Sequence, residues 1–382
     1  MRFPHDVPTL VDHHPTAPVR LRPHRATDAV GALEQCLDPL SRQWTTVPLD
    51  YTLDDAKRFV MHAMPGGWLD DTEWAFAVDA VDDDGEARYA GTVSLRNEGD
   101  ARAEIAYGSH PWVRGRGVME RALRLLLDWG FAERGLRTVI WWANRGNWAS
   151  RKLAWRLGFT VEGAPRQWLA QRGQLLDAWV GTLLAGDLRA PTIPWLDPPR
   201  LVAPHVVLRR LRPDDTGRIV EGCLDPVTAH WLGQLPQPYR LSDAEWFLQD
   251  TEERHATGRA VTWAMADPAD DRLVGIANLF DLRGGLDAEV GYWVHPSARG
   301  RGVATEACRL ALRHAFVPQD DGGLGLQRVR AIAAVDNVGS RTVLERSGLT
   351  CQGRERRLIR LGGGTHADAA VYDVLAEELP AR

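Results

Sequence analysis

Cysteine is scarce in this sequence, and the cysteines that it has are not arranged in pairs. Only 4 occur among 382 residues, with no C-x-x-C spacing and no histidine cluster at the spacing of a zinc site. This pattern excludes a disulfide framework, and we expect no metal cofactor. The thiols are expected to be reduced and mostly buried, as in a cytoplasmic protein. They are Cys36, Cys223, Cys308 and Cys351.

Long hydrophobic runs are also missing. No segment approaches the ~18 apolar residues that a membrane span needs, and the N-terminus lacks the apolar core of a signal peptide, so we expect no membrane association. The formal net charge is -5 at pH 7, which disfavours general binding to the nucleic acid backbone. RNA binding through the two R-G-R-G segments is disfavoured too, because each holds only two arginines.

The chain repeats itself. "AEIAYGSHP" at 103–111 matches "AEVGYWVHP" at 288–296, and "CLDP" occurs at 36–39 and again at 223–226. A period this long indicates duplicated domains, because the repeats of a solenoid run ~20–50 residues. The composition, 44% hydrophobic and 25% charged, is that of a globular protein.

The repeat predicts the domain organisation. Residues 1–17 show no periodicity and are expected to form an N-terminal arm, followed by a first domain over 18–189. Residues 190–204, "APTIPWLDPPRLVAP", have the proline content of a semi-rigid linker. The second domain is then expected over 205–382.

The order of expected elements is the same in both copies. A strand leads to helical segments that contain "CLDP", two strands joined by an acidic turn, and a strand that ends at His-Pro. An amphipathic helix follows, on which Val118, Ala122 and Leu125 recur at helical spacing. Another strand, a short helix and a hairpin close each copy. Strands interspersed with helices predict an α/β fold.

A Gly-Arg turn joins the strand to the amphipathic helix in each copy, as "RGRG" at 114–117 and at 299–302. Its glycines allow positive φ and let a ligand approach the backbone. The helix that follows offers unpaired N–H groups and partial positive charge at its N-terminus, which together cradle a phosphate or pyrophosphate. A plain tight turn with solvated arginines is the alternative, but duplication with matching flanks favours a ligand site.

The turn has neither the G-K-[ST] of a P-loop nor the G-x-G-x-x-G of a dinucleotide fold. An R-G-x-G turn after a strand ending in His-Pro, with N-x-x-S following at 147–150 and 337–340, resembles the GNAT superfamily of acyl-CoA N-acyltransferases. The resemblance is strongest to the RimJ/RimL-like branch of ribosomal-protein alanine acetyltransferases. It spans nearly the whole chain as two tandem domains. It implies in each a mixed, largely antiparallel central sheet flanked by helices, and acetyl-CoA or another acyl-CoA as donor.

The resemblance also implies which residues bind the cofactor, because in the family the backbone amides of this turn bind the pyrophosphate of CoA. The matching residues are Arg114, Gly115, Arg116, Gly117 and Val118 in the first copy, and Arg299, Gly300, Arg301, Gly302 and Val303 in the second. The family often continues with Ala-Thr-Glu-Ala, which matches 304–307 and adds Thr305. The first copy reads "MERA" instead, which places Glu120 where phosphates approach.

Acyl transfer to an amine needs a base for the ammonium proton and a donor for the leaving thiolate. The family's glutamate base, on the strand before the turn, matches Glu104 and Glu289. Burial of a carboxylate there would raise its pKa toward neutrality and suit it to that work. The alternative is a strand glutamate that faces solvent.

The family's serine, which bonds the CoA sulfur and can donate a proton to it, matches Ser150 and Ser340. A helix-capping serine is the alternative. Asn147 and Asn337 likewise either bind CoA or cap the helix. The tyrosine acid of many GNAT enzymes has no counterpart near its usual place, where Trp155 and Leu344 stand.

The resemblance leaves the acceptor open: it implies a primary amine, on a small molecule or at a protein N-terminus, attacking directly within a ternary complex. An acyl-CoA-binding sensor or scaffold, with one or both domains inactive, is the alternative. The protein is expected as a monomer with pseudo-dimeric domains or as a homodimer. Tryptophans gathered in the first copy indicate a core or, alternatively, an aromatic acceptor pocket; they are Trp141, Trp142, Trp148, Trp155 and Trp168.

Overall fold

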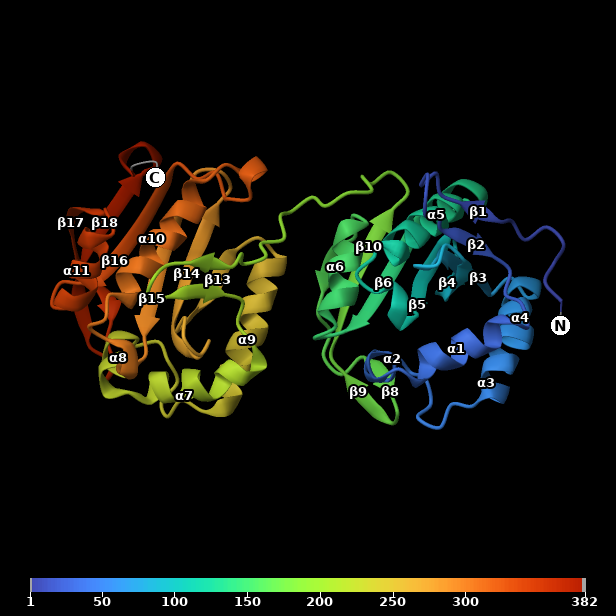
Figure 1. Cartoon of the computed structure of the whole chain (residues 1–382), viewed down its shortest axis with the longest axis horizontal. Helices are drawn as coiled ribbons and strands as arrows, with labels where there is room; N and C mark the ends of the chain where they lie inside the picture. The colour runs from blue at the N-terminus through green and yellow to red at the C-terminus, as the bar shows by residue number, and fades with distance from the viewer. Residues whose placement is uncertain (1, 380–382) are drawn as a thin grey trace. The chain divides into compact units, whose positions relative to one another are not determined.

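The computed structural model describes residues 2–379, and the chain divides into two compact units between Thr192 and Ile193. The two units share one order of sheet strands and helices (Figure 1), with two differences. Unit 1 has an additional hairpin at 169–176, and it has two short helices joined by a π-helical turn at 53–69 where unit 2 has one long helix at 241–256. The segment expected as an arm contains a short strand, β1, which pairs with β2. The segment expected as a linker contains β11, which pairs with β12 in the same way.

Unit 1 holds ten strands and six α-helices within the described residues. The strands are β1 (Leu10–Val11), β2 (Arg20–Arg22), β3 (Glu73–Val81), β4 (Ala87–Gly99), β5 (Arg102–Ser109), β6 (Thr138–Asn144), β7 (Thr160–Gly163), β8 (Leu169–Gln171), β9 (Gln174–Leu176) and β10 (Ala178–Leu184). The helices are α1 (Asp28–Leu37), α2 (Pro39–Trp44), α3 (Leu53–Arg58), α4 (Met64–Leu69), α5 (Val118–Glu133) and α6 (Trp148–Arg156), with one π-helical turn (Phe59–Ala63) between α3 and α4.

Unit 2 repeats this plan with longer closing strands. Its strands are β11 (Leu201–Val202), β12 (Val207–Arg209), β13 (Ala260–Ala266), β14 (Leu273–Arg283), β15 (Asp287–Val294), β16 (Arg328–Ala334), β17 (Thr350–Arg360) and β18 (His366–Leu375). Its helices are α7 (Thr216–Leu224), α8 (Pro226–Trp231), α9 (Leu241–Ala256), α10 (Val303–Phe316) and α11 (Val338–Arg346).

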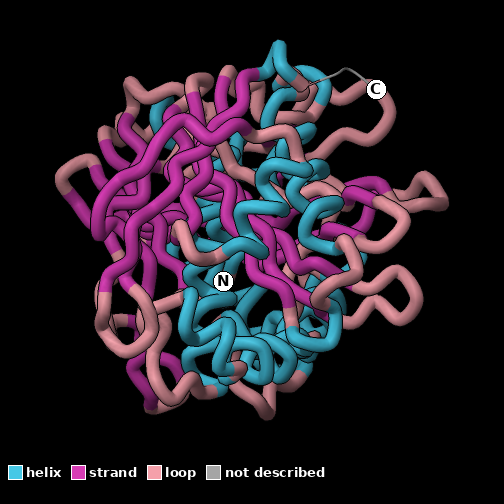
Figure 2. The backbone as a smooth tube through the Cα atoms, turned by 90° about the vertical axis from the view of Figure 1, so that its left-hand side faces the viewer, coloured by secondary structure: helices cyan, strands magenta, loops and turns pink. Residues whose placement is uncertain are grey.

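Each unit is built on one eight-stranded sheet; Figure 2 distinguishes the strands, in magenta, from the helices, in cyan. The strand orders are β1-β2-β3-β4-β5-β6-β10-β7 and β11-β12-β13-β14-β15-β16-β18-β17. Neighbouring strands pair antiparallel, except that β5 is parallel to β6 and β15 is parallel to β16. This confirms the predicted α/β fold with a mixed, largely antiparallel sheet in each half.

Helices cover both faces of the sheet in unit 2, because each carries an apolar stripe. On α10, Val303, Ala307 and Ala311 are buried in the cluster that includes Val290 of β15. On the other face, Ile219 of α7 is buried in a second cluster with β13 and β14 residues. Side chains alternate between the faces of a strand, so β15 contributes to both clusters. The sheet is thus the middle of three layers.

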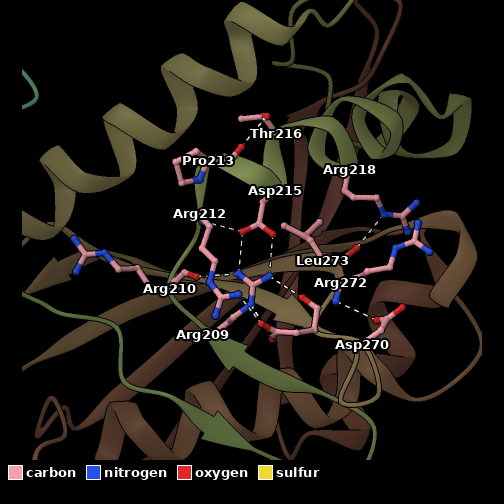
Figure 3. Close-up of polar contacts among 11 residues, drawn as sticks. Arg209, Arg210, Arg212, Pro213, Asp215, Thr216, Arg218, Asp270, Arg272 and Leu273 are labelled. Atoms are coloured by element: carbon pink, nitrogen blue, oxygen red, sulfur yellow. Dashed lines mark hydrogen bonds and ion pairs between the residues drawn. The ribbon is translucent and has the colours of Figure 1, made fainter. Parts of the chain in front are cut away.

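A buried arginine anchors the start of each sheet. In unit 2, Arg209 of β12 donates two hydrogen bonds of 2.9 Å to Asp215, just before α7, and one of 3.0 Å to Asp271 (Figure 3). In unit 1, Arg22 bonds Asp28 and Asp79 in the same manner. Burial opposes the charge on Arg22, but the bonds and charges of the two carboxylates outweigh it and hold its pKa above the usual range.

All four cysteines are free: Cys223 and Cys308 are buried, Cys36 is half-buried and Cys351 is exposed. Among residues 2–379 no group of three or more His, Cys, Asp or Glu side chains is placed to hold a metal ion. No helix in this described part is both long and apolar enough to cross a bilayer.

Candidate active site

The parallel strands of unit 2 part where the predicted site residues lie. β15 and β16 pair only from Asp287 to Glu289 and from Arg328 to Arg330. Beyond these pairs, a cavity of about 790 Å³ is lined by both strands and by residues of α8, α10 and α11. This is the size range of small-molecule and cofactor sites. Glu289, the Gly-Arg turn, Asn337 and Ser340 all line this one cavity.

The Gly-Arg turn adopts the backbone that its glycines were expected to allow. Gly300 and Gly302 have φ of 74° and 79°, and Gly302 is the left-handed residue immediately before α10. A Cβ on either glycine would meet no atom within 4 Å, so open space adjoins the turn. The first turn of α10 therefore presents N–H groups without intrahelical acceptors beside the cavity, the arrangement that suits a phosphate.

The first arginine of each turn binds an aspartate of the repeated "CLDP". Arg299 donates to Asp225 and to the hydroxyl of Thr228, the latter at 2.7 Å. Asp225 also accepts from the Thr228 N–H at 2.9 Å, and so caps α8. In unit 1, Arg114 donates to Asp38 at 2.6 Å in the same way. The aspartate of "CLDP" therefore holds α8 in unit 2, and α2 in unit 1, to the Gly-Arg turn. The sequence analysis did not predict this contact.

The second arginine of each turn reaches toward the acidic hairpin between the third and fourth strands of its sheet. Arg301 lies 3.3 Å from Asp267, and Arg116 lies 2.7 Å from Asp83. Both arginine side chains are exposed, so these pairs are weak and can yield to a ligand.

Glu289 is half-buried at the point where the strands part. Burial raises the pKa of its carboxyl, the charge of Arg330 opposes this, and the charge of Asp281 reinforces it. Within residues 2–379 the Glu289 side chain makes no hydrogen bond or ion pair. Its neighbours across the sheet are Phe280 on β14 and Arg330 on β16. A carboxylate with a raised pKa beside a cavity is suited to take up a proton.

Ser340 lies opposite, on the first turn of α11. Its hydroxyl is 3.1 Å from the hydroxyl of Tyr292, a residue of β15. Asn337 accepts from the Ser340 N–H at 3.0 Å and caps the helix, so the capping role weighed from the sequence is observed. Tyr292 is the functional candidate that sequence reasoning missed; its signal was the "EVGY" at 289–292, repeated as "EIAY" at 104–107.

A family model described as an acetyltransferase (GNAT) domain matches residues 19–160 and again residues 205–350. The chain belongs to the GNAT acetyltransferase family. It is 30% identical over 178 residues to "Putative ribosomal N-acetyltransferase YdaF" of Bacillus subtilis (strain 168), which covers 46% of this chain and 93% of that one. It is 33% identical over 129 residues to "Probable N-acetyltransferase YjcK" of the same strain, covering 33% and 65%.

Among solved structures, Mycobacterium smegmatis RimJ in complex with CoA-disulfide is 24% identical, with a TM-score of 0.42, covering 46% of this chain and 84% of that chain. The family model and the YdaF relative confirm the predicted tandem GNAT N-acetyltransferase of the RimJ/RimL-like branch. The residue assignments within each site are not tested by them and stay predictions.

In the first GNAT domain, Glu104 and Ser150, which correspond to Glu289 and Ser340, have different hydrogen-bond partners. Arg96 of β4 donates to Glu104 at 2.9 Å, where the second domain has Phe280 in the matching register. Burial still raises the pKa of Glu104, but the charge and hydrogen bond of Arg96 oppose the rise. Ser150 lies 2.7 Å from the Tyr107 hydroxyl and also accepts from the Trp141 indole at 3.1 Å.

The tryptophans of the first domain are mostly part of its packing. Trp141 is buried, and Trp148 packs against Trp179 in a tilted arrangement with ring centroids 4.6 Å apart. Trp142 and Trp168 stack at 5.9 Å, and Trp168 is exposed.

Glu120 of the "MERA" segment binds Arg124 at 2.9 Å and lies 3.6 Å from Arg156. Its charge is therefore met by two arginines of the same domain.

Turn geometry is the same in both domains. Gly115 and Gly117 have φ of 76° and 71°, and Gly117 stands before α5 as Gly302 stands before α10. Asn147 caps α6 by accepting from the Ser150 N–H at 3.2 Å. The backbone conformation of the Gly-Arg turn is therefore the same in both domains, whereas the side chains around Glu104 and Glu289 differ.

Proposed function

We propose that the second GNAT domain transfers the acyl group of an acyl-CoA, acetyl-CoA in the simplest case, to a primary amine by direct attack. The observation that carries the proposal is that one cavity is lined by the Gly-Arg turn, Glu289 and Ser340 together. A site for acyl-CoA has to hold a pyrophosphate, a thioester and an amine in one continuous space. The residues present fit that requirement in charge, in backbone geometry and in volume.

When bound, acyl-CoA supplies an acyl thioester, from which the acyl group passes to the amine nitrogen as the C–S bond breaks. Backbone N–H groups from Gly300 to Thr305 hold the pyrophosphate. The Glu289 carboxylate removes a proton from the ammonium group, which frees the nitrogen lone pair. The Ser340 hydroxyl, oriented by Tyr292, passes its proton to the departing sulfur and takes up the second proton that the nitrogen loses as the amide forms.

For the first domain, the Arg96–Glu104 ion pair favours acyl-CoA binding without turnover. The guanidinium of Arg96 stabilises the ionised carboxylate, and it therefore opposes, without cancelling, the rise in the pKa of Glu104 that burial causes. We therefore assign the sensor or scaffold role to this domain and the transfer to the second. The acceptor amine belongs to a small molecule or to a protein N-terminus.

The test compares matched glutamine variants. Glu289→Gln is expected to lower kcat for acetyl transfer to an amine by 10²-fold or more, the range for loss of a general base, while acetyl-CoA affinity measured by calorimetry is unchanged. Glu104→Gln is expected to leave kcat unchanged. Equal loss in both variants would assign turnover to both domains, and loss in Glu104→Gln alone would reverse the assignment.

A further inference from the structure

The acceptor end of the cavity in the second domain has apolar walls. Phe280 lies beside Glu289 on the same face of the sheet, and Ile332 follows Arg330 by two residues on that face. Gly291 leaves room for the ring: a Cβ there would lie 3.0 Å from the Phe280 side chain. Trp231, Leu232 and Ile359 line the same cavity.

The segment at the end of α8 and the β17–β18 hairpin, which both line the cavity, are joined by a backbone contact. The turn between β17 and β18 meets the end of α8, where Gly362 donates to the His230 carbonyl at 2.7 Å. A Cβ at Gly362 would lie 2.4 Å from the Ala229 carbonyl oxygen, and one at Gly233 would lie 2.4 Å from the Leu361 backbone. This close approach fixes Trp231 and Leu232 of one element relative to Ile359 of the other.

Charge in the cavity is restricted to three residues. They are Glu289, Arg299 and Arg346. Arg299 binds Asp225. Arg346 belongs to the cofactor end, because its carbonyl accepts from Arg309, and the following Ser347 bonds the carbonyl of Thr305. Glu289 is therefore the single negative side chain lining the cavity, and it can match one ammonium group.

The corresponding region of the first domain keeps aromatic residues, with Trp142 in the register of Ile332 and Trp44 at the end of α2 as Trp231 is at the end of α8, but it has polar residues at other positions. Arg96 stands in the register of Phe280. Gln171 of the β8–β9 hairpin is buried, accepts from Asn144 at 3.0 Å and donates to the Thr45 carbonyl at 2.6 Å. In the second domain, Ala334 takes the register of Asn144. The uncharged position beside Glu289 is thus a difference between the copies and not a requirement of the fold.

We infer that the acceptor of the second domain is a primary amine carried on a single apolar group, aromatic or branched aliphatic, with no second charge. This inference rests on the proposed function of the same cavity. An apolar group buries surface against Phe280, Ile332 and Trp231. A second ammonium would lose its hydration there without gaining a carboxylate partner. The amine can come from a free metabolite or from the first residue of a peptide, since both present this chemistry.

The test is an acceptor panel with the full chain and acetyl-CoA. Phenethylamine is expected to give kcat/KM at least 10-fold above 1,4-diaminobutane and ethanolamine. A tetrapeptide that begins with phenylalanine is compared with one that begins with aspartate, and activity on peptides alone would assign the amine to a protein N-terminus. Phe280→Ala is expected to raise KM for phenethylamine about 10-fold with acetyl-CoA affinity unchanged. Phe280→Arg, which copies the first domain, is expected to lower kcat as well.

Trp246→Ala is the control, because Trp246 is an exposed aromatic residue of α9 outside the cavity. This variant is expected to leave both KM for phenethylamine and kcat unchanged. If acetyl-CoA binds and 1,4-diaminobutane is acetylated as well as phenethylamine, the inference is overturned and the proposed function stands. If acetyl-CoA does not bind, the proposed function fails and the inference fails with it.

Discussion

At the scale of single residues, the two domains show how one fold accommodates different side chains. In the first, Trp141 of β6 lies opposite Gly181 of β10, and in the second, Ala331 of β16 lies opposite Tyr372 of β18. Trp141 and Tyr372 are both fully buried. A large residue on one strand is therefore exchanged for a large residue on its neighbour, which keeps the volume of the layer constant.

The sequence could predict which residues lie together at the cavity, because a repeated motif marks Glu289, Ser340 and the glycines; their roles stay predictions. Their neighbours were not predicted. Phe280 and Arg96 lie on strands that are joined to the glutamate strand by short hairpin turns, and a register shift in each hairpin changes which residue lies opposite the glutamate. The Tyr292–Ser340 contact joins residues far apart in the chain.

The pH dependence of transfer tests the environment of Glu289. The carboxylate acts only when ionised, and burial raises its pKa while Arg330 opposes the rise. The acid limb of the kcat/KM profile is therefore expected at a higher pH than an ordinary glutamate would give. Arg330→Ile, the residue type of the first domain at this register, removes the opposing charge and is expected to move the limb to still higher pH. An unmoved limb would show that Glu289 does not set the profile.

At the scale of elements, the sequence predicted the strand–turn–helix units well. The positive φ of Gly302 and the apolar stripe of α10 can both be predicted from neighbouring residues in the sequence. The short strands β1 and β11 were not predicted, because two residues carry no periodicity. Neither were the bonds of Asp38 and Asp225 to arginines predicted, since those arginines lie in a distant turn.

The Gly-Arg turn gives a prediction at this scale. Gly302→Ala places a Cβ at φ 79°, where no protein atom lies within 4 Å, so the free energy of unfolding is expected to fall by about 1 kcal/mol from backbone strain. Acetyl-CoA affinity is expected to fall at least 10-fold, because the methyl group occupies the space of the phosphates. Calorimetry and denaturant unfolding measure the two effects.

The matched control is Gly285→Ala, in the turn between β14 and β15, which has φ 69° and equally open surroundings. Gly285→Ala is expected to lower the free energy of unfolding by the same amount, with no change in acetyl-CoA affinity. Similar affinities for both variants would remove the turn from the cofactor site.

At the scale of the whole molecule, the duplicated GNAT domain explains most of the sequence pattern. The strand orders of the two sheets correspond strand for strand, as the repeat predicts. The proposed division of labour goes beyond the sequence, which left open whether one or both domains are inactive; it rests on side-chain partners such as Arg96 for Glu104 and on the cavity between β15 and β16.

In the proposed mechanism the second domain holds acyl-CoA between β15 and β16, and a crystal structure of the full chain with acetyl-CoA is the decisive measurement. The pyrophosphate is expected against the N–H groups of residues 300–305, and the thioester between β15 and β16 within reach of Glu289 and Ser340. Acetyl-CoA bound elsewhere on the chain, with this cavity empty, would contradict the mechanism.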